Sequence, residues 1–97
     1  MQFISTRGQA PPTSFSDVLL AGLAPDGGLY LPQSWPQFSP DEIAAFKGRR
    51  YQDVAFTILS RFTAGSFSDA ELREAVEAAY ADFDAPDIAP LVEIGDA

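Results

Sequence analysis

The chain contains no cysteine and no histidine among its 97 residues, and Lys47 is its single lysine. The absence of cysteine excludes disulfides, thiolate nucleophiles and zinc–thiolate sites. The absence of histidine removes the commonest general base near neutral pH and the commonest transition-metal ligand. Because most catalytic sites use one of these groups, we predict that the chain is not a complete catalyst on its own.

Positive charge and long apolar runs are scarce as well. Six basic side chains stand against fourteen acidic ones, and the net charge of -8 repels phosphate backbones and anionic membrane surfaces. No apolar run approaches the ~20 residues that cross a bilayer, and no basic stretch precedes an apolar one at the N-terminus. We therefore expect a cytoplasmic protein without nucleic-acid or membrane partners. With 46% hydrophobic residues, it should fold as one domain.

Periodicity and turn residues predict an α+β fold with about four helices and a few short strands. At three predicted helix starts a serine is followed three residues later by an acidic residue, which is typical of an N-terminal capping box. The apolar residues of 51–62 recur at i, i+3 and i+4, which is typical of one buried helix face. We expect helices at 14–24 (ended by Pro25), 39–48, 51–62 and 68–83, and strands at 2–7, 29–31 (stopped by Pro32) and 91–94.

The strand expected at 91–94 ends shortly before the last residue, and nothing after it completes a sheet. A strand needs a neighbour for its backbone hydrogen bonds. We therefore expect this sequence to be one part of a longer protein.

The first candidate site is the stretch Ser5, Thr6 and Arg7, followed by Gly8. It places two hydroxyls beside a guanidinium, a combination that binds phosphate or carboxylate groups. A strand end that turns into a loop, with Arg7 in a surface ion pair, explains the same residues and is favoured from them alone.

The second candidate is the stretch Asp26, Gly27 and Gly28, which has the small residues of a phosphate-binding loop. Such a loop leads into a helix, whereas a strand-like Leu-Tyr-Leu follows here. A tight turn is therefore the better interpretation, because Pro25 sets one corner and glycine tolerates positive φ at the next.

Three further features have ordinary structural explanations. Lys47 is the only candidate amine for a Schiff base, but its place before Gly48 at a predicted helix end favours a capping role. Trp35 fits a small core beneath a loop better than a partner-docking role. The acidic residues near the C-terminus do not match a calcium loop and fit a solvated helix face; they are Glu71, Glu74, Glu77, Asp82, Asp84 and Asp87.

The order of these local motifs resembles the start of threonine synthases over essentially all 97 residues. The most diagnostic part is the block from Gly22 to Pro32, Gly-Leu-Ala-Pro-Asp-Gly-Gly-Leu-Tyr-Leu-Pro, at its spacing after Ile4-Ser5-Thr6-Arg7-Gly8. Further similarity lies in Ser14-Phe15 with Asp17-Val18-Leu19-Leu20, in Trp35-Pro36, in the predicted helix from Tyr51, in Tyr80 with Phe83, and in Ala89-Pro90-Leu91.

The resemblance implies the N-terminal domain of a pyridoxal-phosphate enzyme with the tryptophan-synthase-like fold. Enzymes of this family convert O-phospho-L-homoserine and water into L-threonine and phosphate. Their Schiff-base lysine lies beyond the matched stretch, in a segment like Phe-His-Gly-Pro-Thr followed by Phe-Lys-Asp, so Lys47 does not inherit that role.

It follows from the resemblance that pyridoxal phosphate and O-phospho-L-homoserine belong to the full-length enzyme, and that no cofactor is expected in this chain. The remaining domains of the same polypeptide are then its partners. The residues expected to face those domains or the substrate cleft are Ser5, Thr6, Arg7, Asp26, Gly27 and Gly28.

Two other classes of function stay open. A stand-alone interaction module would need an exposed apolar face, for instance around Trp35 and residues 91–94, although a separated enzyme domain would expose the same face. A regulatory ligand-binding domain would use Arg7, but one arginine without a second cation is thin support.

Overall fold

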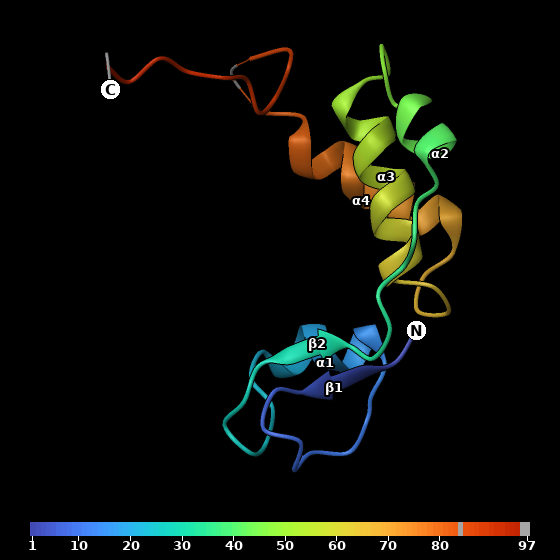
Figure 1. Ribbon diagram of the computed structural model, residues 1–97, viewed down its shortest axis with the longest axis vertical. Helices are drawn as coiled ribbons and strands as arrows, with labels where there is room; N and C mark the ends of the chain where they lie inside the picture. The colour runs from blue at the N-terminus through green and yellow to red at the C-terminus, as the bar shows by residue number, and fades with distance from the viewer. Residues whose placement is uncertain (84, 96–97) are drawn as a thin grey trace.

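The computed structural model describes residues 1–83 and 85–95. These residues form a small α+β fold in the order β1, α1, β2, α2, α3, α4 (Figure 1), which confirms the predicted class. The strands are Phe3–Ser5 (β1) and Tyr30–Pro32 (β2), and the helices are Phe15–Ala21 (α1), Pro40–Ala44 (α2), Tyr51–Phe62 (α3) and Asp69–Tyr80 (α4).

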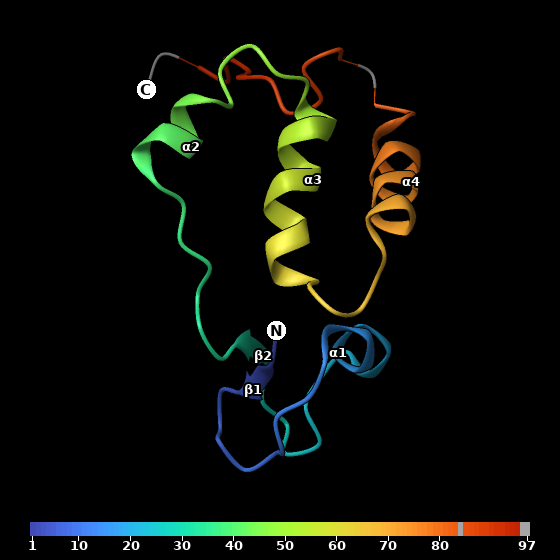
Figure 2. The same ribbon diagram turned by 90° about the vertical axis from the view of Figure 1, so that its right-hand side faces the viewer.

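The elements form two neighbouring groups. The β1–β2 ladder and α1 lie together at one end, and α2, α3 and α4 lie at the other, with α3 between α2 and α4 (Figure 2). Helices α3 and α4 pack against each other, and α4 contributes the buried residues Leu72 and Val76. Arg73 of α4 also lies 2.8 Å from Asp53 of α3, an ion pair that aligns the two helices.

Strands β1 and β2 run antiparallel, with Phe3 opposite Pro32 and Ser5 opposite Tyr30. The prediction that Pro32 stops the second strand is wrong, because Pro32 is the last residue of β2. Hydrogen bonds flank it, from Gln33 N to Gln2 O at 2.8 Å and from Thr6 N to Leu29 O at 2.8 Å. The Phe3–Pro32 pair therefore occupies a non-hydrogen-bonded position, where a missing N–H costs nothing.

Helix α1 ends at Ala21, earlier than the predicted end before Pro25. Gly22 adopts a φ of 73° and donates its N–H to Val18 O at 3.0 Å. This left-handed glycine terminates the helix before Pro25 is reached, because glycine has no Cβ to oppose a positive φ. Leu23, which falls within the helix expected at 14–24, lies outside α1.

The predicted helix starts are confirmed, and their capping differs in completeness. Ser14, Ser39 and Ser68 each accept a hydrogen bond from the backbone N–H three residues later. At α4 the reciprocal bond from Ser68 N to Glu71 is also present, which completes a capping box. At α2 the side chain of Glu42 instead lies 3.2 Å from Arg61, so the predicted box is only half formed.

Three further predictions of element bounds are wrong. Helix α4 ends at Tyr80, three residues before the end of the helix expected at 68–83. Helix α2 ends at Ala44 and turns follow as far as Gly48, so the expected helix to residue 48 is shorter by one turn. Residues 91–94 form no strand, and Leu91 and Ile94 are fully exposed. The sheet in the described part of the chain contains β1 and β2 alone, so residues 91–94 have no neighbour that would supply backbone hydrogen bonds.

The hydrophobic core is thin for a chain of this length. The Cα radius of gyration is 16.3 Å, against ~13 Å for a compact 100-residue domain. The accessible surface of 7086 Å² exceeds the roughly 5,400 Å² expected of a monomer of 10.4 kDa. Across the described residues, no helix is long and apolar enough to cross a membrane. The buried apolar residues are Phe3, Ala24, Leu72, Val76 and Ile88.

The complete capping box makes Ser68 the helix start most sensitive to substitution. Ser68→Ala removes the acceptor for Glu71 N and should cost about 1 kcal/mol, which lowers the melting temperature by roughly 4–8 °C. Thermal unfolding followed by circular dichroism measures this shift. Ser34→Ala, in the exposed loop after β2, is the control and should leave the melting temperature unchanged. Equal shifts in both variants would contradict a stabilising role for the box.

Candidate functional site

The carboxylate of Asp26 joins the two stretches that the sequence singled out. Ser5 Oγ donates to it and lies 2.7 and 2.8 Å from its two oxygens. Gly28 N donates to Asp26 Oδ1 at 2.9 Å, and Gln9 N donates to Oδ2 at 3.0 Å. The turn at 25–28 is thereby fastened to the chain that leaves β1. Gln9 was missed in the sequence because it contributes only a backbone group, which its residue type does not reveal.

These hydrogen bonds lower the pKa of the Asp26 carboxyl below its ordinary value of 3.8. The largest cause is the Ser5 hydroxyl, followed by the Gly28 and Gln9 backbone donors, and the positive charge of Arg7 adds to them. Donors that favour the charged form hold Asp26 ionised. It is an acceptor in a structural network and is not poised as a general acid near neutral pH.

Thr6 and Arg7 complete the cluster in different ways. Thr6 Oγ1 accepts a hydrogen bond from Leu29 N at 3.0 Å, which extends the ladder beyond β2 by one pair. Arg7 Nη1 donates to the Asp26 carbonyl at 3.0 Å, and Arg7 remains an exposed residue. The guanidinium has five donors, so this single bond orients it and leaves most of its fork facing outward.

Gly27 and Gly28 are required by geometry at this site. Gly27 has a φ of 83°, and a Cβ there would lie 2.7 Å from Arg7 Nη1. A Cβ on Gly28 would overlap Ser5 Oγ and would lie 2.9 Å from Thr6 Oγ1. Any larger residue would separate the turn from β1, so both glycines allow a close approach of backbone to side chain.

The amide groups of this turn do not form a phosphate cradle. Gly27 N donates to Ala24 O at 2.9 Å, and Gly28 N is taken by Asp26. Strand β2 follows the turn, as predicted, so no helix N-terminus points at it. Lys47, the only amine that could form a Schiff base, lies exposed in the turn after α2. These residues do not fit pyridoxal phosphate, because neither an enclosed lysine nor free phosphate-binding amides are offered.

The remaining candidates from the sequence, Trp35 and the acidic residues near the C-terminus, do not form a binding site in the described residues. Trp35 contacts Phe62 edge-on at 6.0 Å between ring centroids but is otherwise exposed. Glu71 belongs to the capping box, and Glu77 lies 2.6 Å from Arg50. Within residues 1–83 and 85–95, no group of acidic residues is arranged to hold a metal ion, and Asp84 lies outside the described residues.

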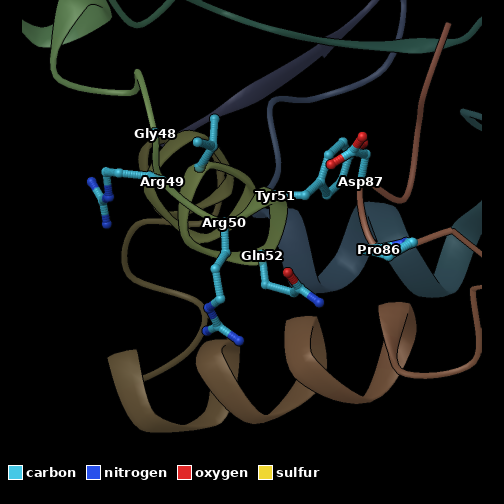
Figure 3. Close-up of a pocket in the computed structure, with 8 residues that line it drawn as sticks. Gly48, Arg49, Arg50, Tyr51, Gln52, Pro86 and Asp87 are labelled. Carbon is cyan, nitrogen blue, oxygen red and sulfur yellow. The ribbon is translucent and has the colours of Figure 1, made fainter.

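One cavity of the molecule is lined by none of the residues of the Asp26 cluster. It measures about 520 Å³, opens between the start of α3 and residues 86–87, and is lined in part by Arg49, Arg50 and Tyr51. Figure 3 shows the Arg50 side chain directed toward α4, where it pairs with Glu77, and the Arg49 side chain turned away from Pro86. Because its charged groups do not converge, this cavity is a weaker candidate than the Asp26 cluster.

The lowered pKa of Asp26 predicts a pH-dependent contribution to stability. The carboxylate stabilises the fold above its unfolded pKa of about 3.9, and this contribution is lost as pH falls through the lower folded value. Asp26→Asn should therefore lower the urea midpoint at pH 7, and this difference should shrink as the pH falls below 3.8. Asp82→Asn, an exposed carboxylate after α4, is the control. A deficit of Asp26→Asn that stayed constant with pH would contradict the assignment.

Known proteins with a similar sequence are much longer than this chain. The chain is 48% identical over 94 residues to the threonine synthase of Pseudomonas aeruginosa, covering 97% of this chain and 20% of that protein. It is 50% identical over 105 residues to the threonine synthase of Methylobacillus glycogenes, covering 99% and 22%. A solved structure of PLP-bound threonine synthase from Brucella melitensis superposes with a TM-score of 0.91 at 48% identity, over 96% of this chain and 20% of that one.

The chain thus spans about one fifth of the length of these relatives. The family described as the threonine synthase N terminus matches residues 2–80, a range that contains β1, β2, all four helices and the Asp26 cluster. The chain belongs to the threonine synthase N-terminus family.

Proposed function

We propose that residues 1–97 are the N-terminal domain of a threonine synthase, and that the enzyme converts O-phospho-L-homoserine and water into L-threonine and phosphate with pyridoxal phosphate. The observation that carries this proposal is the family match over residues 2–80, together with 48–50% identity to two threonine synthases. The PLP-bound state of the Brucella melitensis relative supports the choice of cofactor. This chain then supports an active site that lies in the rest of the polypeptide.

The isolated chain is inactive in this proposal and binds no cofactor. It has no histidine or cysteine, and Lys47 is exposed in a turn. A Schiff-base lysine acts in an enclosed site that holds its cofactor, and an exposed turn does not enclose a cofactor. The catalytic lysine and the phosphate-binding loop therefore belong to the remaining four fifths of the enzyme.

The Asp26 cluster is the part of this chain that serves the active site or the domain contact. Asp26 uses both carboxylate oxygens within the chain, so it holds the cluster rigid and binds no ligand itself. Arg7 is exposed and oriented by the Asp26 carbonyl. A guanidinium held in this way is suited to a carboxylate or phosphate, from a neighbouring domain or from the substrate.

A chimera tests the domain assignment. The aligned N-terminal segment of the Pseudomonas aeruginosa enzyme is replaced by this chain, and the product is called the chimera below. We expect the chimera to bind pyridoxal phosphate, to release phosphate from O-phospho-L-homoserine and to restore growth of a threonine auxotroph. The enzyme without this segment is the control and should lack activity. An internal-aldimine absorbance from the isolated chain, or a folded chimera without activity, would contradict the proposal.

Arg7→Ala in the chimera tests the role of the cluster. Loss of a charge-assisted contact should lower kcat/KM about tenfold if Arg7 faces the substrate, or lower the melting temperature by a few degrees if it faces a domain. Arg7→Lys keeps the charge without the planar fork and should restore only part of the loss. Arg49→Ala, an exposed arginine before α3, is the matched control. Unchanged kinetics together with an unchanged melting temperature in Arg7→Ala would sink the proposal.

A stand-alone interaction module remains the second candidate function, because the chain exposes many large apolar side chains. It differs from the first candidate in needing no further domains of its own. The chimera separates the two, since a module unrelated to catalysis would not restore threonine synthesis.

A further inference from the structure

An apolar groove is lined by residues of α1, α3 and α4 and of the loop before α4. Its volume is about 270 Å³, and none of its lining residues carries a charge. The only lining hydroxyls are those of Thr63 and Tyr80, and Thr63 Oγ1 donates to Leu59 O at 3.0 Å within α3. The large apolar side chains of the lining are Phe15, Leu19, Leu59, Phe67, Leu72 and Val76.

The chain does not close this groove by itself. No residue of α1 is buried, and Leu19 is 62% exposed at the rim. Phe15 contacts Phe67 edge-on at 6.0 Å between ring centroids, so one aromatic contact joins α1 to the loop before α4. The groove has no charged lining residue, although the chain carries a net charge of -8. An apolar surface of this kind is typical of an interaction site, where the partner excludes water.

The exposed area is large enough for a permanent interface. The accessible surface is about 1,700 Å² greater than expected for a monomer of this mass. A stable interface of standard size removes about 800 Å² from each partner. The exposed surface of the whole chain, of which the groove is one part, is therefore sufficient for an obligate contact.

We propose that this groove is the docking site for an apolar segment, flanked by basic side chains, of the polypeptide that completes the threonine synthase. This inference rests on the proposed function. The helices α1, α3 and α4 carry six acidic and two basic side chains, a net charge of -4, so basic residues at the edges of the segment complement the net charge of these helices.

Charge and tethering both select this occupant over a second copy of the chain. Two copies that meet through this face would bring like charges together, because each carries a net charge of -8. A segment in the same polypeptide is present at an effective concentration on the order of millimolar, which a separate molecule rarely reaches. The relatives have ample length for such a segment, since four fifths of each lies outside the match.

Because the chain contains no cysteine, a single introduced thiol can report whether a partner covers the groove. Leu19→Cys places a thiol in the groove, and Leu23→Cys places one at a matched position that does not line it. The two leucines are 62% and 59% exposed, so without an occupant their thiols would be alkylated at similar rates. In the chimera we expect iodoacetamide to modify position 19 at least about tenfold more slowly than position 23, measured by peptide mass spectrometry.

Three outcomes decide the proposal. Alkylation of position 19 in an active chimera as fast as in the isolated chain overturns the docking site while leaving the proposed function intact. Protection of position 19 that disappears on dilution assigns the groove to a second copy and also overturns it. Protection that is independent of concentration supports it, and this holds even in a chimera without turnover, where only the proposed function fails.

Discussion

The Asp26 carboxylate is the contact on which one half of the molecule depends. Strands β1 and β2 are separated in sequence by α1 and two loops, so their pairing carries the entropy cost of a long closed loop. A two-stranded ladder of three pairs is marginal alone. Ser5, Gln9 and Gly28 all donate to Asp26, and these bonds fasten the far end of the ladder to the turn that leads into β2. Gly28 is small enough to let that turn reach β1.

The other half of the molecule is held by helix caps, ion pairs and partial burial. Leu72 and Val76 are buried between α3 and α4, while α1, α2 and α3 contain no buried residue. Cation–π contacts of Arg61 with Phe38 and of Arg73 with Phe56 cover part of the remaining aromatic surface. Helices that bury so little of their apolar faces obtain most of their stability from partners. This physical state agrees with a domain that occupies one fifth of its relatives.

The candidate site follows the same division between internal structure and external contact. Ser5, Thr6 and Asp26 use their polar atoms within the chain, whereas the guanidinium of Arg7 faces outward. The sequence named these residues in two separate stretches and allowed either an anion site or a strand end with a turn. The structure joins the stretches into one cluster, and the hydrogen bonds of the turn show that its amides are already occupied. A residue list cannot reveal that the stretches join, because Ser5 and Asp26 lie 21 residues apart in sequence and Gln9 contributes only its backbone N–H.

The sequence by itself determined the features whose hydrogen bonds and contacts form between residues close together in the chain. Ser68 with Glu71 begins α4, the apolar period bounds α3 at 51–62, and Asp26-Gly27-Gly28 forms a turn. Only the tertiary structure decided that Pro32 belongs to β2, that Ser5 reaches Asp26, and that residues 91–94 stay unpaired. The physical reason is how far apart in the sequence the interacting residues lie. Caps, turns and helical periodicity depend on neighbouring residues, whereas strand pairing and side-chain bridges depend on distant segments whose approach no local pattern encodes.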